Sequence, residues 1–222
     1  MADIKLTEDN LVHLQIFQAL LPQVRQYIRR YTPPDWPALA SVLSVVVDKP
    51  LGPLAILPLA SCAAVSGDPH EAIPMAAAWE VCSLAMRILD DLQDQDRPDG
   101  LWAKVGLPRA FNFSATLYAL CNELLAQAAW SAERYRAISR DFTQMALRLA
   151  AGQDQDMRGE THTVEEYWRI IENKNASAFA LACAAGALCG TDDLTLVGAC
   201  RTFGHHLGLA LQLFDDFEGF WE

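Results

Sequence analysis

Apolar residues recur along most of the chain at the three- and four-residue spacing of helices, and alternating strand-like patterns between turn pairs are essentially absent. The turn-rich segment at 31–37 separates two apolar helices. The valine-rich part of the apolar run at 39–65 is prone to form strand, but its proline-rich flanks and helical neighbours favour a buried helix. The pattern therefore predicts an all-α fold. Further helices are expected at about 108–130, 132–157, 164–189 and 192–218.

A strong helix start lies in GDPHEAIP, residues 67–74. Asp68 can cap the helix, Pro69 suits its first position, and Glu71 stands where a capping box has its acidic residue. The helix that begins here is expected to run to a group of aspartates and to end at RPDG, residues 97–100.

A second start has Thr163 as the cap and Glu166 three residues later, again the spacing of a capping box. Two interruptions are expected in the later helices. One lies near Gly159, because glycine favours a helix end, and the other lies near Asn175.

The chain has 222 residues, of which 52% are apolar, so it can bury a sizeable core and is expected to form one domain. Its net charge is −11. An acidic protein of this kind repels nucleic acid backbones and anionic membrane surfaces. Nucleic acid is therefore excluded as a partner, and bound phosphate groups would need metal ions or a few well-placed basic residues.

The six cysteines show no CxxC spacing and mostly stand among alanine and leucine. They are interpreted as small buried residues in a reducing compartment. The first ten residues carry no signal-peptide pattern, and the apolar run at 39–65 is too interrupted to span a membrane. These features favour a cytoplasmic protein without stable membrane insertion.

The first candidate site is the acidic end of RILDDLQDQDRPDG, residues 87–100. Asp90 and Asp94 share one helix face, and Asp91 lies beside them. Like charges at this spacing destabilise a helix by about 0.2–0.5 kcal/mol per pair, and helix C-termini disfavour anions. A solvated helix end remains one interpretation. The other is a Mg²⁺ site, because carboxylate oxygens are hard ligands that suit this ion.

A second apolar helix, GLALQLFDDFEGFW at 208–221, also ends in an Asp-Asp pair. Gln212, Asp215 and Asp216 are spaced so that they share a face. Gly204 and Gly208 precede them by one and two turns and allow close approach of another helix. Facing each other, the two acidic helix ends would form a mouth of carboxylates able to hold several Mg²⁺ ions around a diphosphate.

Between the two clusters, IIENKNASAFALACA at 170–184 places Lys174 at the start of an alanine-rich helix. By itself it is most simply an ordinary surface lysine. In a pocket with two acidic clusters it becomes a candidate for contacting a phosphate oxygen as a point charge.

These motifs resemble the trans-isoprenyl diphosphate synthases, or polyprenyl synthetases. DDLQDQD is similar to their first aspartate-rich motif, QLFDD to the start of the second, ENKNASAF to their K-T-x segment and GQDQDM at 152–157 to their G-Q-x-x-D segment. The resemblance covers the chain from about Lys49 onward. It implies one isoprenoid-synthase-like domain over residues 1–222, an all-α type I helical bundle around a central apolar cavity, without the C-terminal portion of the family domain.

The resemblance also implies the chemistry, in which Mg²⁺ holds an allylic isoprenyl diphosphate and helps pyrophosphate leave, after which isopentenyl diphosphate attacks the allylic cation. A homodimer is the family's usual assembly. Ala85 and Met86 would line the cavity floor, and because neither is aromatic a chain longer than ten carbons is admissible. By position, the metal-binding residues would be Asp90, Asp91, Asp94, Asp215 and Asp216, the catalytic residues Lys174 and Gln212, and further substrate-binding residues Lys49, Glu80 and Arg97.

Several departures from the family pattern fall on the basic residues that hold isopentenyl diphosphate. Lys49 is kept, but Gly52 stands where a second arginine is usual, and where the family has a pair of arginines directly after the first motif this chain has only Arg97. Ser83 replaces the family's histidine before that motif, and the last aspartate of the second motif is lost. The metal site is therefore retained, whereas the isopentenyl diphosphate site is degenerate.

Three functions remain open on the sequence. The first is a prenyltransferase, which elongates a chain or transfers the prenyl group to another acceptor. The second is terpene synthase-type ionisation and cyclisation of a prenyl diphosphate. The third is a non-catalytic regulatory subunit of a heteromeric prenyl synthase, against which the retained aspartates argue.

Overall fold

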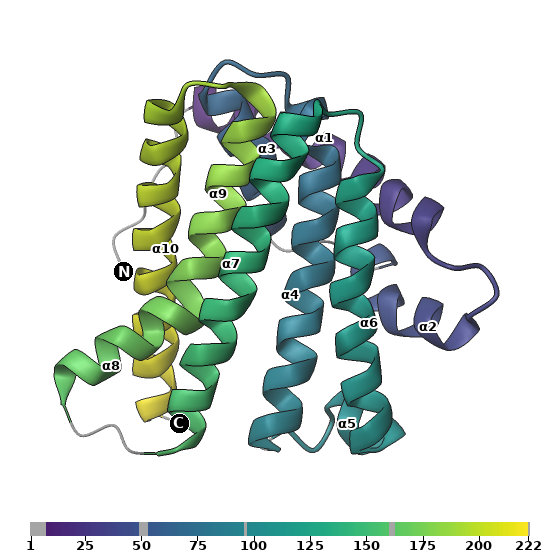
Figure 1. Ribbon diagram of the computed structural model, residues 1–222, viewed down its shortest axis with the longest axis vertical. Coiled ribbons are helices and arrows are strands. Elements are labelled where there is room, and N and C mark those ends of the chain that lie inside the picture. The colour runs from purple at the N-terminus through teal and green to yellow at the C-terminus, as the bar shows by residue number, and fades with distance from the viewer. Residues whose placement is uncertain (1–7, 49–52, 96, 160–162, 222) are drawn as a thin grey trace.

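The computed structural model of the chain describes residues 8–48, 53–95, 97–159 and 163–221, and every regular element in these ranges is a helix. The prediction of an all-α fold is confirmed. Figure 1 shows most of the long helices side by side along the long axis of the molecule, whereas the N-terminal helix runs across the upper part of the bundle. The elements are α1 (Glu8–Tyr31), α2 (Pro37–Val47), η1 (Pro53–Ile56), α3 (Leu57–Ala64), η2 (Pro69–Ala72), α4 (Ile73–Asp94), α5 (Leu101–Val105), α6 (Leu107–Ala126), α7 (Ala132–Met157), α8 (Val164–Ile171), η3 (Glu172–Ala176), α9 (Ser177–Gly190) and α10 (Leu194–Trp221).

Helix α4 is a core helix of the bundle and packs against α6, α1, α3 and α9. Met75 and Val81 on it are completely buried. With the preceding turn η2 it forms a segment, Pro69–Asp94, that is long and apolar enough to cross a membrane, but 61% of its most apolar stretch is buried inside the bundle. Burial on all sides is the pattern of a core helix, which explains its apolar character.

The valine-rich run predicted as a buried helix forms α2. Leu39, Leu43 and Val46 on it are almost entirely buried. This interpretation is confirmed, because most of the valines that would suit a strand are buried on a short helix, with Val45 alone among them exposed. The next part of the run forms α3, which packs against α9.

Both predicted helix starts are present. The Asp68 carboxylate accepts a hydrogen bond from the backbone N–H of His70, with Pro69 between them, so the cap acts on η2 and not on the Glu71 amide as a capping box would. At the second start the full capping box forms, with Thr163 and Glu166 each accepting from the backbone of the other.

The helix expected at 164–189 is interrupted near Asn175, as predicted, by the π-helical turn η3. Such single turns carry one residue more than an α-helical turn and are frequent at functional sites. Here the turn separates α8 from α9 and carries Lys174. The other predicted interruption is also confirmed, since α7 ends at Met157 and Gly159 has a positive φ of 63°.

Two glycines bring α10 against α9 and η3. A Cβ added to Gly204 would lie 2.3 Å from the carbonyl oxygen of Phe179, and one added to Gly208 would lie 2.7 Å from the Cα of Ala176. Both positions therefore require glycine for steric reasons, which confirms the close approach predicted from the sequence. This contact fixes the second aspartate motif relative to Lys174.

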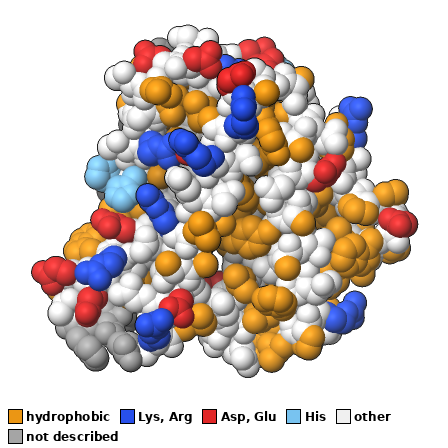
Figure 2. Space-filling view, in the orientation of Figure 1, with side chains coloured by type: hydrophobic (Ala, Val, Ile, Leu, Met, Phe, Trp, Pro, Cys, Tyr) orange, Lys and Arg blue, Asp and Glu red, His pale blue; other side chains and the backbone are white. Residues whose placement is uncertain are grey.

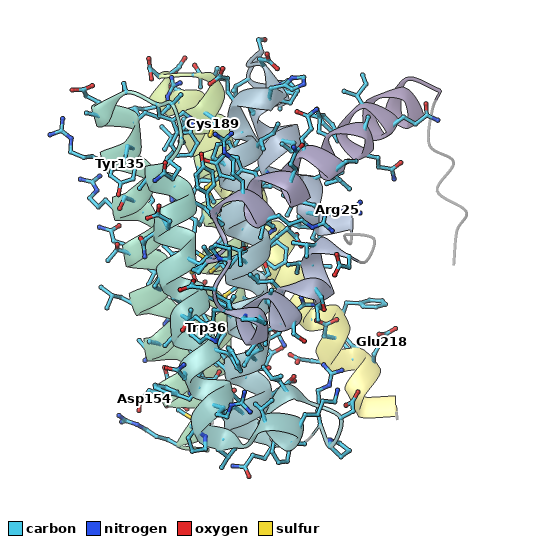
Figure 3. All side chains as sticks on the ribbon, turned by 90° about the vertical axis from the view of Figure 1, so that its right-hand side faces the viewer. Arg25, Trp36, Tyr135, Asp154, Cys189 and Glu218 are labelled. Atoms are coloured by element: carbon cyan, nitrogen blue, oxygen red, sulfur yellow. The ribbon has the colours of Figure 1, made fainter. Side chains whose placement is uncertain are left out.

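The acidic segments finish at the same end of the molecule. Figure 1 places the C-terminal ends of α4, α7 and α10 together at the lower end, near η3. Figure 3 shows Asp154 of α7 and Glu218 of α10 in the lower half, whereas Tyr135 and Cys189 lie towards the other end. The fold therefore gathers the candidate chemistry at one end of the bundle.

Candidate functional site

Lys174 links two acidic helix ends. Its Nζ lies 2.5 Å from Oδ2 of Asp156 at the end of α7 and 3.7 Å from Oδ1 of Asp90 in the first aspartate motif. The lysine side chain is only 22% exposed. An ammonium that is half-buried between carboxylates is not an ordinary surface lysine, so the structure favours the interpretation in which Lys174 belongs to a site.

The environment of Lys174 raises its pKa. Burial lowers the pKa of this ammonium, but the hydrogen bond that it donates to Asp156 and the charges of Asp156, Asp90 and Asp94 outweigh the burial. The side chain is therefore a permanent cation at neutral pH, and it compensates part of the negative charge at this end of the bundle.

The first aspartate motif occupies the last turns of α4. The helix ends at Gln95, whose backbone is left-handed with φ 51° and whose N–H bonds the carbonyl of Asp91. Arg97 lies 3.6 Å from the carboxylate of Asp91. The predicted substrate-binding arginine thus lies beside the metal motif. Asp94 acts on Lys174 electrostatically, whereas Asp96, Lys49 and Gly52 lie outside the described residues.

The second aspartate motif forms a chain of hydrogen bonds with η3 and α8. Asn175 donates from Nδ2 to Oε1 of Gln212 at 2.8 Å, and Gln212 donates from Nε2 to Oδ1 of Asp216 at 2.8 Å. The hydroxyl of Tyr167 donates to the other oxygen of Asp216. Burial and the hydrogen bond with Asp216 raise the pKa of Tyr167 to about 12, so this hydroxyl keeps its proton at neutral pH.

The π-turn η3 therefore stands between the two motifs, with Lys174 directed to Asp90 and its neighbour Asn175 to Gln212. Within the described residues, no three of the His, Cys, Asp and Glu side chains lie close enough together to hold a metal ion. The two aspartate motifs share one end of the bundle, but their carboxylates do not form a closed metal cage. The predicted metal roles of Asp90, Asp91, Asp94, Asp215 and Asp216 remain predictions.

Two residues of the GQDQDM segment were not predicted as site residues, and one of them contacts Lys174. Asp156 pairs with Lys174, and Gln153 is 7% exposed with an Nε2 that has no hydrogen-bond partner among the described residues. The signal that could have identified both is the segment itself. Their neighbour Gly152 permits the contact, because a Cβ there would lie 2.8 Å from Cβ of Asn173.

Further up α4, Glu80 is buried, with 8% of its surface exposed. Burial raises its pKa to about 7, and the charge of Arg87 opposes the shift only in part. Ser83, which replaces the family's histidine, donates its hydroxyl to the carbonyl of Trp79, one turn earlier in the same helix. Glu80 thus lies in the core, about ten residues before the first aspartate motif, and its predicted role in binding substrate stays a prediction.

The predicted floor residues differ in exposure. Ala85 is completely buried, and its carbonyl accepts a hydrogen bond from the Ser114 hydroxyl of α6 at 2.9 Å. Met86 is half-buried and packs against the core. Both lie on α4 within a turn or two of Asp90, as the prediction requires, and their contact with a prenyl chain stays a prediction.

A hollow of about 490 Å³ lies away from the aspartate motifs, between α7, η3, α9 and α10. Its lining includes Asp141, Arg148, Arg201 and His205. Figure 2 shows basic and histidine side chains gathered over α7 and α10 on this face. Because polar and charged residues make up most of the lining, this hollow is not the central apolar cavity that the resemblance implies, and that cavity stays a prediction.

Solved structures with the same fold are prenyl synthases. A geranylgeranyl pyrophosphate synthetase from Pyrococcus horikoshii superposes with a TM-score of 0.84 over 94% of this chain and 67% of its own, at 24% identity. A polyprenyl synthetase from Streptomyces coelicolor superposes with a TM-score of 0.77 over 93% of this chain and 64% of its own, at 26% identity. The fold is therefore that of the type I isoprenoid synthases.

The sequence comparisons lead to the family. The polyprenyl synthetase family profile matches residues 48–221. The chain is 34% identical over 175 residues to a geranylgeranyl diphosphate synthase from Mycobacterium tuberculosis, which covers 75% of this chain and 49% of that protein. It is 28% identical over 147 residues to the tryptophan prenyltransferase ComQ of Bacillus spizizenii, which covers 66% of this chain and 50% of that protein.

The chain belongs to the polyprenyl synthetase family. It spans about half the length of the curated relatives that it matches. The match includes both aspartate motifs, Lys174 and the GQDQDM segment, which are the parts that the fold brings to one end of the bundle.

Proposed function

We propose that the chain is a Mg²⁺-dependent prenyltransferase that acts on an allylic isoprenyl diphosphate. The observation that carries the proposal is the position of the Lys174 ammonium between Asp156 and Asp90, at the end of the bundle where both aspartate motifs finish. A cation held among carboxylates suits a diphosphate that binds through metal ions. Family membership supports the same chemistry.

The residues present fit Mg²⁺. The donors at this end are carboxylate oxygens, which this ion prefers, and Lys174 already occupies a position where positive charge offsets them. Mg²⁺ would be held mainly by Asp90, Asp94 and Asp215, with Asp91 and Asp216 beside them. When bound, it supplies charge neutralisation for the departing pyrophosphate.

The chain's own residues bind the diphosphate and exclude water. Lys174 places a fixed positive charge where negative charge develops as the bond between the allylic carbon and the diphosphate oxygen breaks and its electron pair leaves with pyrophosphate. The unpartnered Nε2 of Gln153 is a buried donor that an anionic oxygen would satisfy. The apolar side chains of α4 keep water from the allylic cation that remains.

The acceptor is the part of the reaction on which this chain departs from the family pattern. Gly52 and Ser83 replace basic or ionisable residues of the isopentenyl diphosphate site, and Arg97 stands alone where the family has a pair of arginines directly after the first motif. A second diphosphate would bind weakly to this acidic protein without those cations. The similarity to tryptophan prenyltransferases supports an acceptor other than isopentenyl diphosphate.

The proposed assembly is a homodimer in the cytoplasm, without nucleic acid or a stable membrane contact. The net charge of −11 supports the exclusion of nucleic acid. Light scattering after size-exclusion chromatography tests the assembly, because a mass of twice 24.5 kDa is expected. Recovery only with a second, different polypeptide would instead support a subunit of a heteromeric synthase.

The test of the function is a product assay with Mg²⁺ and geranyl, farnesyl or geranylgeranyl diphosphate, each with and without isopentenyl diphosphate or tryptophan. Release of pyrophosphate and the lipid products are both measured. Prenyl transfer to either acceptor supports the proposal and identifies the acceptor. Cyclic or hydroxylated products without an acceptor would support terpene synthase chemistry instead.

A matched control separates catalysis from contamination. Asp90→Asn removes a proposed metal ligand, whereas Asp154→Asn removes a carboxylate from the exposed side of α7, where Asp154 pairs with Arg158. Turnover that the first substitution abolishes and the second leaves intact supports the site. Absence of turnover in all mixtures would reject an enzymatic role. Pyrophosphate release that Asp90→Asn leaves unchanged would also reject it, because that release would not come from the site.

A further inference from the structure

Both oxygens of Asp216 are held by donors from separate helices. Gln212 donates to Oδ1 from within α10, and Tyr167 donates to Oδ2 from α8. Asn175 of η3 completes the chain through Oε1 of Gln212. These four side chains, Tyr167, Asn175, Gln212 and Asp216, are called the Asp216 clamp below. It connects α8, η3 and α10.

The clamp gives the two carboxylates of the Asp-Asp pair different roles. Hydrogen bonds to both oxygens fix the rotamer of the Asp216 carboxylate and occupy two of its roughly four acceptor positions, so it has less capacity to bind a metal ion than an unbonded carboxylate. Asp215, the preceding residue, forms no hydrogen bond or ion pair with the residues that the structure describes. The two adjacent carboxylates are therefore in different states, one already engaged and one available.

The clamp also changes what Gln212 can do. Its carbonyl oxygen accepts from Asn175 and one of its N–H groups is used by Asp216. Only one N–H therefore remains for a ligand. The predicted contact of Gln212 with the diphosphate is reduced to that single donor, and its larger contribution is to join η3 to the second motif.

Asn175 makes the clamp a property of this sequence. The resemblance places it at the threonine of the family's K-T-x segment. An asparagine amide extends one bond further from the backbone than a threonine hydroxyl, and it reaches Gln212 at 2.8 Å. Because Asn175 directly follows Lys174 in η3, any displacement of the clamp is transmitted to the ammonium that pairs with Asp156 and Asp90.

We propose that Tyr167 and Asn175 are positioning residues, and that the Asp216 clamp sets the distance between Lys174 and Asp215, the metal-binding carboxylate of the second motif. The proposal rests on the proposed function for the identity of the ligands, metal ion and diphosphate. The clamp consists of hydrogen bonds between side chains of this chain, so its existence can be tested independently.

The first test measures Mn²⁺ binding by electron paramagnetic resonance, together with KM and kcat for the allylic diphosphate. Tyr167→Phe removes one hydroxyl, and we expect Mn²⁺ affinity to fall roughly three- to tenfold, as for loss of a hydrogen bond to a charged group. The KM should rise by a similar factor while kcat changes by less than about twofold. Tyr135→Phe, on α7 near the other end of the bundle, is the matched control and should change neither value.

Asp215→Asn should abolish Mn²⁺ binding at the second aspartate motif. Asp216→Asn should retain most of this binding, because the amide oxygen of the new side chain still accepts a hydrogen bond from Tyr167. Equal losses in the two variants would overturn the division between ligand and anchor. Equal Mn²⁺ affinity in wild type and Tyr167→Phe would overturn the positioning role.

The second test is a double-mutant cycle in metal-free protein, with Tyr167→Phe and Asn175→Thr followed by chemical denaturation. The clamp predicts that the two losses of stability are not additive, because Tyr167 and Asn175 belong to one connected chain of hydrogen bonds through Gln212 and Asp216. Additive losses would overturn the clamp whatever the enzyme does. If wild-type protein binds no Mn²⁺, the proposed function and the metal part of this proposal fail together, whereas the cycle still decides whether the clamp exists.

Discussion

Lys174 and Asp156 form the central contact of the site, with the ammonium 2.5 Å from the carboxylate oxygen. The two residues come from different segments, η3 and the end of α7, and Gly152 allows those segments to approach. The same ammonium lies 3.7 Å from Asp90. One side chain thus holds together the ends of two helices that carry like charges, which would otherwise repel each other.

Replacing Lys174 with glutamine should remove most of the activity. Glutamine can still donate a hydrogen bond to Asp156, but the fixed positive charge is lost, and removal of one preorganised group of this kind lowers kcat by roughly a hundredfold. Steady-state kinetics measure the change. Lys104→Gln in α5 is the control, because that lysine is exposed. A Lys174→Gln enzyme with wild-type kcat would refute the catalytic role of the ammonium.

Removal of the metal should abolish turnover reversibly. EDTA is expected to stop pyrophosphate release, and Mg²⁺ added back should restore it, because the oxygen donors at the site require a hard divalent cation. Asp90→Asn should raise the Mg²⁺ concentration needed for half-maximal rate by at least about tenfold. Full activity in EDTA would contradict a metal-dependent reaction.

Glu80 should make stability depend on pH. Burial raises the pKa of Glu80 to about 7, so the folded state favours the protonated form. The sign follows directly: the stabilisation is complete below the unfolded pKa near 4.5 and is lost as pH rises towards 7. Glu80→Gln should remove this slope and raise stability at pH 8 by roughly 3 kcal/mol. Urea unfolding of wild type and Glu80→Gln at pH 5 and pH 8 tests this prediction. The same change in the free energy of unfolding between the two pH values in both proteins would contradict it.

Gly204→Ala should destabilise the fold. The added Cβ would lie 2.3 Å from the carbonyl oxygen of Phe179, so α10 must move away from α9, at a cost of roughly 1–3 kcal/mol. Gly198 in the same helix has nothing within 4 Å of the corresponding position, and Gly198→Ala should stabilise the helix by roughly 0.5–1 kcal/mol. Thermal unfolding of both variants measures the contrast. Equal effects would show that steric contact does not decide the role of Gly204.

The helices and their starts could be predicted because they depend on local signals. The capping box at Thr163 and the interruption near Asn175 depend on residues close to them in the sequence, and both are confirmed. The shared helix faces of the aspartates could be predicted from their spacing, whereas their roles as metal ligands came from the family resemblance and stay predictions. Asp156 could not, because its importance arises from the packing of α7 on η3, which brings it to Lys174 across 18 positions of the chain.

The hydrogen bond of Tyr167 is a second long-range contact that the sequence could not predict. The residue stands in a predicted helix without any charge or spacing that would indicate a partner, and its contact with Asp216 spans 49 positions. Local pattern cannot indicate such a pair. The predicted roles of Gln212 and Arg97 rested on family resemblance, and the structure adds which of their donors are already in use.

The π-turn η3 changes the direction in which the residues of α9 point around the helix relative to those of α8. Tyr167 and Phe179, which both meet α10, are twelve positions apart, and an uninterrupted α-helix would point them about 120° away from each other. The extra residue taken up by the wide turn leaves an offset of only about 20°. Both segments can therefore face the same neighbouring helix. A single-residue deletion in η3 would turn one of them away, so the length of this turn is as strictly set as its chemistry.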